Sequence, residues 1–153
     1  MKFKNKVQEQ FKKAGWYIDR NVSSKYLNVN TISDFPETAR EFLFEYGDLV
    51  IEDCKPYDSD VINKLHIEEV SAEEIINEAQ YEFNKKLFPL GYFHPDHYSV
   101  YIDSDEKVYL IGDYYFIIGD SLKEGIENII EDNWNNSLEW DSIEKKWLKN
   151  KPN

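Results

Sequence analysis

Cysteine, glycine and long apolar runs are scarce in this sequence, and their scarcity argues against disulfides, glycine-rich motifs and membrane anchors. Its 153 residues include one cysteine, Cys54, and six glycines. One cysteine excludes an internal disulfide framework, and the glycines stand singly, so they match no Walker, dinucleotide-binding or nucleophile-elbow motif. No apolar run approaches the roughly 20 residues of a membrane span, and the lysine-containing first residues lack the apolar segment of a secretory signal. We therefore expect a soluble protein of the cytoplasm that does not bind membranes.

Basic residues are scarce in the central part of the chain. The net charge is −12, and residues 31–130 carry seven Lys or Arg against twenty-three Asp or Glu, a local net charge of −16. A field of this sign repels nucleic-acid phosphates and attracts basic proteins. Because acidic surfaces also favour solubility, the charge argues strongly against nucleic-acid binding and only mildly for a basic protein partner.

The apolar residues that are present suffice for one folded domain, at 41% hydrophobic and 16% aromatic. Residues 87–120 have the clearest strand pattern. We expect strands at residues 90–94, 98–102, 108–111 and 114–118, joined by short turns into an antiparallel meander. Residues 116–118 are apolar at every position, so at least one strand is expected to be covered on both faces.

Helical periodicity surrounds this meander. It predicts helices over residues 2–13, from 33–36 to Gly47, from Ser71 to Leu87 and from Ser121 to Trp134. Gly15 and Gly47 end the first two helices, Ser33 or Asp34 caps the second, and Ser71 and Ser121 each begin a capping box. Short strands are expected at 49–51 and 62–70, with a loop over 52–60 between them. This order predicts an α+β fold, a single domain in which one layer of helices packs on a mainly antiparallel sheet.

Residues 133–153 form a tryptophan-containing tail. Trp140, Ile143 and Trp147 stand at the i, i+3, i+7 spacing of a helix face. We expect a short helix that folds back on the same domain.

No group of residues demands catalysis. His94, Asp96 and His97, two histidines and one carboxylate, could hold zinc, but no further His or Cys stands nearby to complete the site, since Cys54 and His66 lie far off in sequence. The acidic run at 103–106 lacks the EF-hand pattern, and nothing near Cys54 activates a thiolate. We therefore expect no catalytic residue, no metal and no cofactor.

Tyrosine is more abundant than a core of this size needs, at eleven residues, and it concentrates in the meander. Tyrosines among carboxylates make an effective protein-binding surface, because they offer rigid contact area together with charge, although each single tyrosine could equally line the core. We expect the contact residues to be Tyr92, Asp96, Tyr98, Asp103, Asp105, Asp113, Tyr114 and Tyr115.

A series of short motifs runs along residues 1–132. They are Gly15-Trp16 with Arg20, Ala39–Leu43 leading to Tyr46-Gly47-Asp48-Leu49, Leu87-Phe88-Pro89-Leu90-Gly91, the strand Tyr98–Asp103, Val108-Tyr109, and Gly119-Asp120-Ser121-Leu122. Their order and spacing resemble the SUKH superfamily, in particular its third subfamily of bacterial immunity proteins. Two positions depart from that pattern: Glu106 stands where such hairpins often carry glycine, and Asp48 where a second glycine is usual after Gly47.

Four residues of these motifs are assigned to the fold rather than to contacts. They are Trp16, Arg20, Pro89 and Gly91. We expect Trp16 to cover the edge of the core and Arg20 to pair with a carboxylate.

The resemblance implies an immunity domain over residues 1–132, with the tail at 133–153 packed on it. It further implies a protein that is not an enzyme, which binds and neutralises a cognate polymorphic toxin domain, such as a nuclease or a deaminase, in the cytoplasm of the producing bacterium. The acidic centre suggests that this toxin is basic. The sequence leaves the oligomeric state open.

Two other readings remain. The same superfamily fold also occurs in proteins that recruit others, so the chain could be an intracellular scaffold or regulatory interaction domain, and a neighbouring toxin gene would separate the two. A small hydrolase that uses paired carboxylates, assisted by a metal at His94 and His97, is the remote alternative because no motif supports it.

Overall fold

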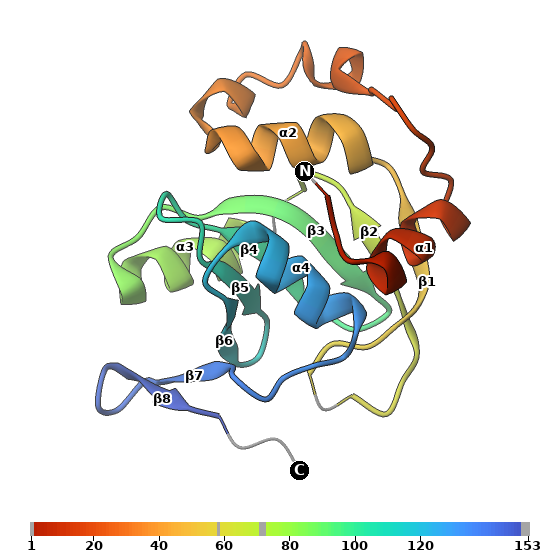
Figure 1. Cartoon of the computed structure of the whole chain (residues 1–153). Helices are drawn as coiled ribbons and strands as arrows, with labels where there is room; N and C mark the ends of the chain where they lie inside the picture. Colours follow the sequence, from red (N-terminus) through yellow and green to blue (C-terminus); the bar gives the residue numbers. More distant parts are fainter. Residues whose placement is uncertain (1, 58, 71–72, 151–153) are drawn as a thin grey trace.

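A computed structural model describes residues 2–57, 59–70 and 73–150 of the chain (Figure 1). The helices are α1 (Asn5–Lys13), α2 (Glu37–Tyr46), α3 (Glu73–Phe83) and α4 (Leu122–Ile130), and the short 3-10 helices η1 (Ser23–Tyr26) and η2 (Ile32–Asp34) lie between α1 and α2. The strands are β1 (Val50–Cys54), β2 (Asn63–Ile67), β3 (Phe88–His94), β4 (Ser99–Ile102), β5 (Val108–Ile111), β6 (Tyr115–Gly119), β7 (Leu138–Asp141) and β8 (Lys146–Lys149).

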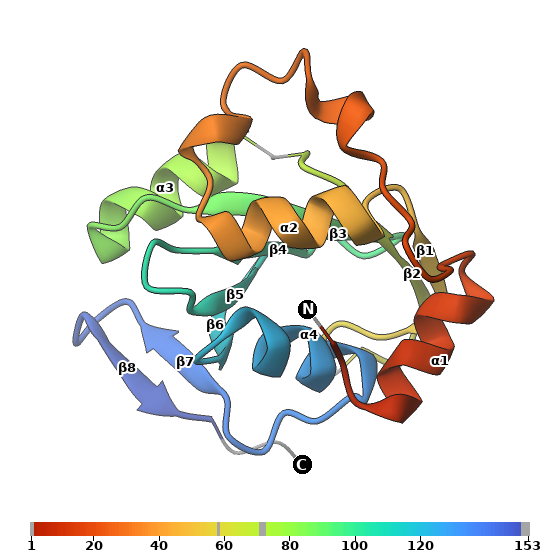
Figure 2. The same ribbon diagram turned by 45° about the horizontal axis from the view of Figure 1, so that its top comes forward.

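The eight strands form one sheet in sequence order, β1 to β8, and each pairs with the next in antiparallel orientation. Figure 2 shows this order, with β1 and β8 at opposite ends of the sheet. Short connections between consecutive antiparallel strands produce a meander without crossovers. The predicted α+β fold with an antiparallel meander is therefore confirmed.

Three helices cover one face of the sheet and build the main core. Apolar residues of α1, α2 and α4, such as Phe11, Phe42 and Ile126, are buried against inward-facing residues of β1 to β6. In Figure 1 α4 lies in front of the strands, with α2 above it and α1 at the right. The aromatic rings of this core meet at close range, with Phe11 and Tyr46 centroids 4.5 Å apart.

The fourth helix, α3, covers the opposite face. Ile76 and Ala79 of α3 pack with Tyr101, Tyr109 and Ile117 in a second, smaller core. The expectation of a single helical layer is therefore wrong, because the sheet is apolar on both faces along β4 to β6. The expectation that a strand is covered on both sides is confirmed in β6, whose burial is nearly continuous.

The helix ends follow most of the predicted signals. Gly15 follows α1 with φ +115°, and a Cβ on Gly47, just after α2, would lie 2.2 Å from the Tyr26 hydroxyl. Ser121 Oγ accepts a hydrogen bond of 3.1 Å from the Glu124 amide, as the capping pattern requires. The predicted cap of α2 is wrong, because Ser33 and Asp34 belong to η2 and α2 begins after Pro36 without a side-chain cap. The predicted cap Ser71 lies outside the described residues.

The residues between α1 and α2 fasten the end of α2. Trp16 Nε1 donates to Glu45 Oε2 at 2.8 Å, and the Trp16 ring stacks on Tyr46. Among the described residues no carboxylate pairs with Arg20, so the expected ion pair is not seen. The Arg20 guanidinium donates to the backbone carbonyls of Glu45 and Gly47, which α2 leaves without intrahelical partners at its C-terminus.

The two positions that depart from the family's glycines have the backbone that glycine favours. Asp48 has φ +67° and Glu106 has φ +68°. Both lie in the left-handed region, where a side chain is strained. This chain therefore keeps the turn geometry without the glycine.

Two predictions of secondary structure are wrong, one for the loop at 52–60 and one for the tail. β1 continues to Cys54 and so includes three residues of the predicted loop at 52–60. The tail forms the β7–β8 hairpin instead of a short helix. Trp140 and Trp147 pair across this hairpin with ring centroids 5.2 Å apart, so residues seven apart contact one another as they would on a helix, while Ile143 is 91% exposed in the turn.

Candidate interaction site

Six of the eight expected contact residues gather at one end of the meander. In an antiparallel meander alternate turns lie at the same end of the sheet, so the β3–β4 and β5–β6 turns are neighbours. Three hollows in the surface meet there, and each of the six residues lines at least one of them: Tyr92, Asp96, Tyr98, Asp113, Tyr114 and Tyr115. We call this set the turn surface.

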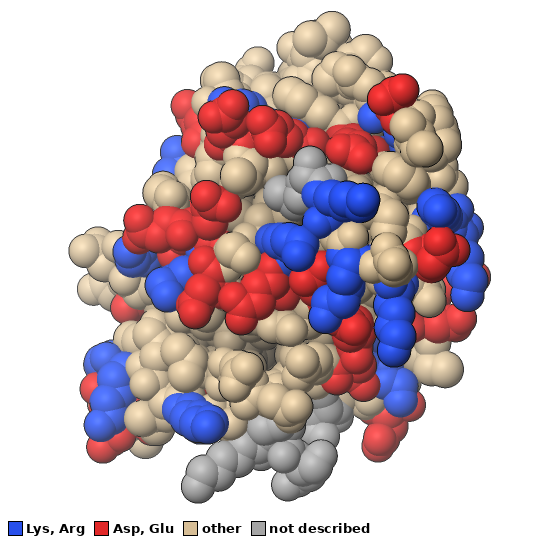
Figure 3. Space-filling view, in the orientation of Figure 1, with Lys and Arg blue, Asp and Glu red and all other residues tan. Residues whose placement is uncertain are grey.

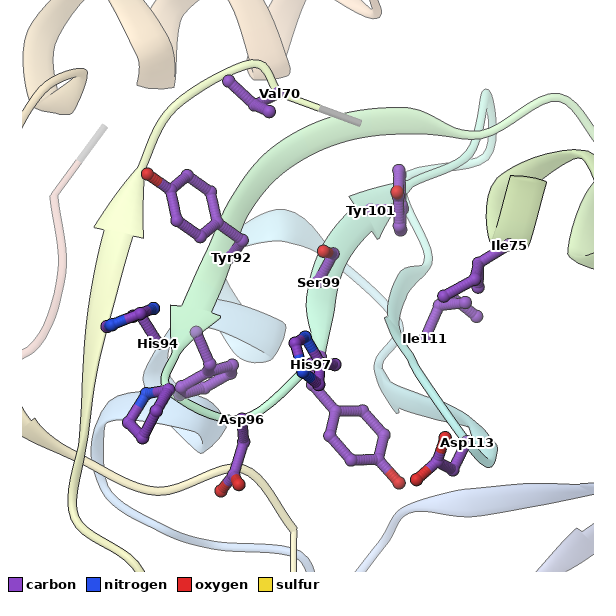
Figure 4. A pocket seen from close by; sticks show the side chains of 13 residues that line it. Val70, Ile75, Tyr92, His94, Asp96, His97, Ser99, Tyr101, Ile111 and Asp113 are labelled. Carbon is purple, nitrogen blue, oxygen red and sulfur yellow. The ribbon is translucent and has the colours of Figure 1, made fainter. Parts of the chain in front are cut away.

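The first hollow, the sheet hollow, lies between the N-terminal part of α3 and the β3–β4 turn (Figure 4). It has a volume of about 540 Å³. Tyr92, Ser99 and Tyr101 come from β3 and β4, Ile75 from α3, and Asp113 from the β5–β6 turn. Its floor is thus mainly aromatic and aliphatic, with polar groups at the turns. Such a concave surface suits an apolar side chain of a partner.

The hairpin hollow and the loop hollow adjoin the same turn. The hairpin hollow lies between α3, the β5–β6 turn and the β7–β8 hairpin, and it is lined by Glu78, Tyr81, Glu82, Asp113, Tyr114, Tyr115, Trp140, Ser142 and Lys145. The loop hollow is lined by Pro56, Tyr57, Ser59, Asp96, Tyr98, Tyr114, Phe116 and Glu139. Asp113 belongs to two of the three hollows, and so does Tyr114. The β5–β6 turn is therefore the ridge between them.

The side chains on this ridge are free to meet a partner. Tyr114 is 63% exposed, Asp113 is exposed, and among the residues that the structure describes neither forms an ion pair or a side-chain hydrogen bond. Asp96 differs, because its Oδ2 accepts hydrogen bonds from Ser59 Oγ at 2.7 Å and Asn63 Nδ2 at 2.9 Å. Asp96 thus lines the sheet hollow and the loop hollow, and it also holds the β1–β2 loop at Ser59 and the start of β2 at Asn63 in place.

Burial and nearby carboxylates raise the pKa of two tyrosines of the turn surface, Tyr98 and Tyr115. Burial raises the pKa of Tyr98 to about 12, with Asp113 and Glu139 acting in the same direction. The pKa of Tyr115 is raised by burial and then by the charges of Glu78 and Glu82. These hydroxyls therefore remain protonated at neutral pH and can donate hydrogen bonds to a partner.

The other two expected contact residues lie at the opposite end of the sheet, in the β4–β5 turn. Asp103 is fully buried, so it is not the exposed residue of the meander that the pattern predicts. Its carboxylate accepts hydrogen bonds from the amides of Asp105 at 2.8 Å and Lys107 at 3.0 Å, and from the Tyr109 hydroxyl at 2.7 Å. Asp105 is exposed but pairs with Lys85 at 3.1 Å. Neither side chain reaches the turn surface.

α3 and the β7–β8 hairpin bring further residues to this site, which the sequence pattern did not indicate. Tyr81 is 89% exposed and stands off the apolar stripe of α3, a pattern that could have marked it as a surface aromatic. Glu82 pairs with Lys145 across 63 residues, with Nζ–Oε distances of 2.7 and 3.0 Å. That pair could not be found from sequence, because it depends on where the hairpin packs.

The acidic centre of the chain is not neutralised by the lysines near its start. Figure 3 shows Lys and Arg side chains most densely at the centre and right of this face, where α1 lies, interspersed with Asp and Glu, and further Asp and Glu side chains at the upper left. On the other side of the sheet, α3 presents exposed Glu74 and Glu78 and the partly buried Glu82. The turn surface therefore adjoins a row of carboxylates.

The residues considered for metal binding or thiol chemistry are His94, His97 and Cys54. Within residues 2–57, 59–70 and 73–150, no three His, Cys, Asp or Glu side chains are grouped so that they could hold a metal ion. His94 and His97 are exposed. Cys54 is buried, and burial raises the pKa of its thiol to about 12, so it is not a thiolate at neutral pH. No helix in the described part of the chain is both long and apolar enough to cross a membrane.

A comparison with protein families matches residues 3–132 to the family described as SUKH-3 immunity protein. The match spans α1 to α4 and ends before the β7–β8 hairpin. No curated protein and no solved structure matches the chain.

Proposed function

This chain belongs to the SUKH-3 immunity protein family, and we propose that it binds a cognate polymorphic toxin domain in the cytoplasm of the producing bacterium and blocks the activity of that toxin. The observation that carries this proposal is the turn surface. Six tyrosines and aspartates chosen as contact residues line three adjoining hollows around one exposed turn. A concave surface that is rich in tyrosine and ends in exposed carboxylates has the composition of a protein interface.

The turn surface would act by contact rather than by catalysis. Tyr114 and Asp113 project from the ridge, and the neutral hydroxyls of Tyr98 and Tyr115 lie beside it. Tyrosines on a rigid strand end lose little conformational entropy when they bind. Residues 1–132 would act as the immunity domain, and the tail at 133–153 would complete its surface through the hairpin.

The partner is expected to be basic. The net charge of −16 over residues 31–130 and the carboxylates along α3 favour a positively charged toxin, of which nucleases and nucleic-acid deaminases are examples. The acidic inhibitor would then occupy the basic substrate channel of the toxin in place of the nucleic-acid phosphates. Affinity that does not fall with added salt would contradict this electrostatic part of the proposal.

Co-purification tests the function. The toxin domain encoded beside this gene is co-expressed with the full chain, and the complex is isolated and tested for rescue of growth. We expect a stable one-to-one complex and full rescue. A folded protein that neither binds nor rescues would contradict the immunity role.

A further inference from the structure

The hairpin hollow combines carboxylates with aromatic rings from three separate segments. Its volume is about 480 Å³. Glu78 and Glu82 come from α3, Asp113 from the β5–β6 turn, and Lys145 from the turn between β7 and β8. Three carboxylates face one ammonium group, so the hollow has a net negative charge.

The pairing within the hollow leaves carboxylates available. Lys145 Nζ lies 2.7 Å from one Glu82 oxygen and 3.0 Å from the other. Across the described parts of the chain, Glu78 and Asp113 form no ion pair. The Lys145 ammonium therefore already pairs with Glu82, and the carboxylates of Glu78 and Asp113 remain available for a second cation.

Aromatic rings form the remaining walls. Tyr81 is 89% exposed and Tyr114 is 63% exposed, while Tyr115 and Trp140 are partly buried in the same lining. The faces of such rings attract cations. A guanidinium group satisfies both features at once, because it is planar, stacks on aromatic rings and offers a fork of donors to carboxylates.

We propose that the hairpin hollow takes an arginine side chain of the bound partner, with the carboxylate of Glu78 as the main acceptor and the rings of Tyr81, Tyr114 and Tyr115 as its walls. That the partner is a toxin rests on the function proposed above. The Lys145 ammonium on Glu82 acts as an internal competitor for the same negative charge.

Part of the hollow lies outside the segment that matches the family. Trp140, Ser142 and Lys145 lie beyond residue 132, where the match to the family ends. The tail thus adds a cation-binding subsite to the family's domain. Differences in this segment would change which toxin is recognised without changing the fold of residues 3–132.

The test uses the free full-length protein and small probes in an NMR titration. The indole N–H of Trp140 is a suitable reporter, because it is buried and has no hydrogen-bond partner among the described residues. Acetyl-arginine amide is expected to shift this resonance in a saturable way, acetyl-lysine amide less, and acetyl-citrulline amide, the neutral isostere, not at all. Equal shifts with the citrulline probe would overturn the proposal.

Substitutions then assign the acceptor. Glu78→Gln should weaken binding of the arginine probe at least about threefold, the size of one partly exposed charge pair, and Lys145→Gln should strengthen it. Glu41→Gln, on the exposed side of α2 across the sheet, is the matched control and should change nothing. Glu78 has no ion pair to lose, so its substitution is not expected to disturb the fold. Equal effects of Glu78→Gln and Glu41→Gln would also overturn the proposal.

The two proposals fail separately. Saturable arginine binding without toxin rescue would contradict the immunity role and keep the subsite. Rescue by a protein whose toxin affinity and arginine binding are both unchanged by Glu78→Gln would keep the role and remove the subsite.

Discussion

The β4–β5 and β5–β6 turns both place aspartate near tyrosine, and they use these residues in opposite ways. In the β4–β5 turn Asp103 is fully buried and holds two backbone amides and the Tyr109 hydroxyl. In the β5–β6 turn Asp113 and Tyr114 are exposed at the junction of the hollows. The carboxylate of the first turn stabilises the fold, and the carboxylate of the second turn is accessible to a partner.

The difference follows from turn length. Five residues, 103–107, join β4 to β5, so the chain can fold back over Asp103 and enclose it. Three residues, 112–114, join β5 to β6, and so short a connection leaves its side chains pointing outward. Gly112 permits the Tyr98 ring to pack closely against the β5–β6 turn, because a Cβ on residue 112 would lie 2.5 Å from that ring.

The largest contrast is expected in stability. Asp103→Ala should lower the free energy of unfolding by about 3 kcal/mol, because it removes a buried acceptor and leaves its donors unsatisfied. Asp113→Ala should change it by less than about 0.5 kcal/mol, as exposed positions do. Chemical denaturation measures both. Equal losses in the two variants would contradict the distinction between the turns.

Binding should show the reverse contrast. Tyr114→Ala is expected to weaken the complex with the toxin at least tenfold, or about 1.4 kcal/mol, because an exposed aromatic residue at the centre of an interface contributes heavily. Its free energy of unfolding should stay unchanged. Tyr81→Ala, at the outer side of the hairpin hollow, should have a smaller effect on affinity. Calorimetry on each variant measures these values, and unchanged affinity in Tyr114→Ala would move the interface away from this turn.

Alkaline titration distinguishes Tyr109, the buried tyrosine of β5 that donates a hydrogen bond to Asp103 in the first turn. Burial, and then the hydrogen bond and charge of Asp103, raise the pKa of Tyr109. A raised pKa contributes stability that is fully present below about pH 10, the unfolded value, and is lost as the pH rises further. Tyr109→Phe should therefore reduce the fall of unfolding free energy above pH 10 by up to about 1.4 kcal/mol per pH unit.

Tyr114→Phe, which removes an exposed hydroxyl, is the control for that substitution. Denaturant titrations at a series of alkaline pH values give the slopes. A slope in Tyr109→Phe identical to that of the unsubstituted protein would show that this tyrosine is not the group responsible.

The smallest effect concerns the strained residue of the β4–β5 turn. Glu106→Gly should raise the free energy of unfolding by about 0.5 kcal/mol. Glycine adopts φ +68° without strain, which stabilises the folded state, but its greater conformational entropy in the unfolded chain offsets part of that stabilisation. Asp105→Gly, at a neighbouring position without positive φ, should lower stability instead. Thermal unfolding compares the two, and a loss in both variants would contradict the strain argument.

Sequence patterns predicted the parts of the fold that local residues determine. The strands at 108–111 and the ends of helices at Gly15, Gly47 and Ser121 lie where expected. The spacing of Trp140 and Trp147 does not distinguish a helix from the observed hairpin, because it fits a helix face and a cross-strand pair equally well. The second helical layer was missed because periodicity shows which face of α3 is apolar but not which face of the sheet it covers.

The candidate site was predictable in composition but not in arrangement. The meander pattern predicts that Tyr114 and Asp113 are exposed, and they are exposed. The same pattern predicts an exposed Asp103, whose burial depends on hydrogen bonds from residues two to six positions later. The contribution of Lys145 needed the tertiary packing of the hairpin on α3.

Charge reversal at the two turns decides which end of the sheet binds the toxin. Asp113→Lys and Asp105→Lys introduce the same change at exposed positions at opposite ends of the meander, and affinity for the toxin domain is measured for both at one salt concentration. We expect Asp113→Lys to weaken binding at least about tenfold and Asp105→Lys by less than about twofold. Equal affinities in the two variants, or a greater loss with Asp105→Lys, would contradict the assignment of the β5–β6 turn as the toxin-binding end of the sheet.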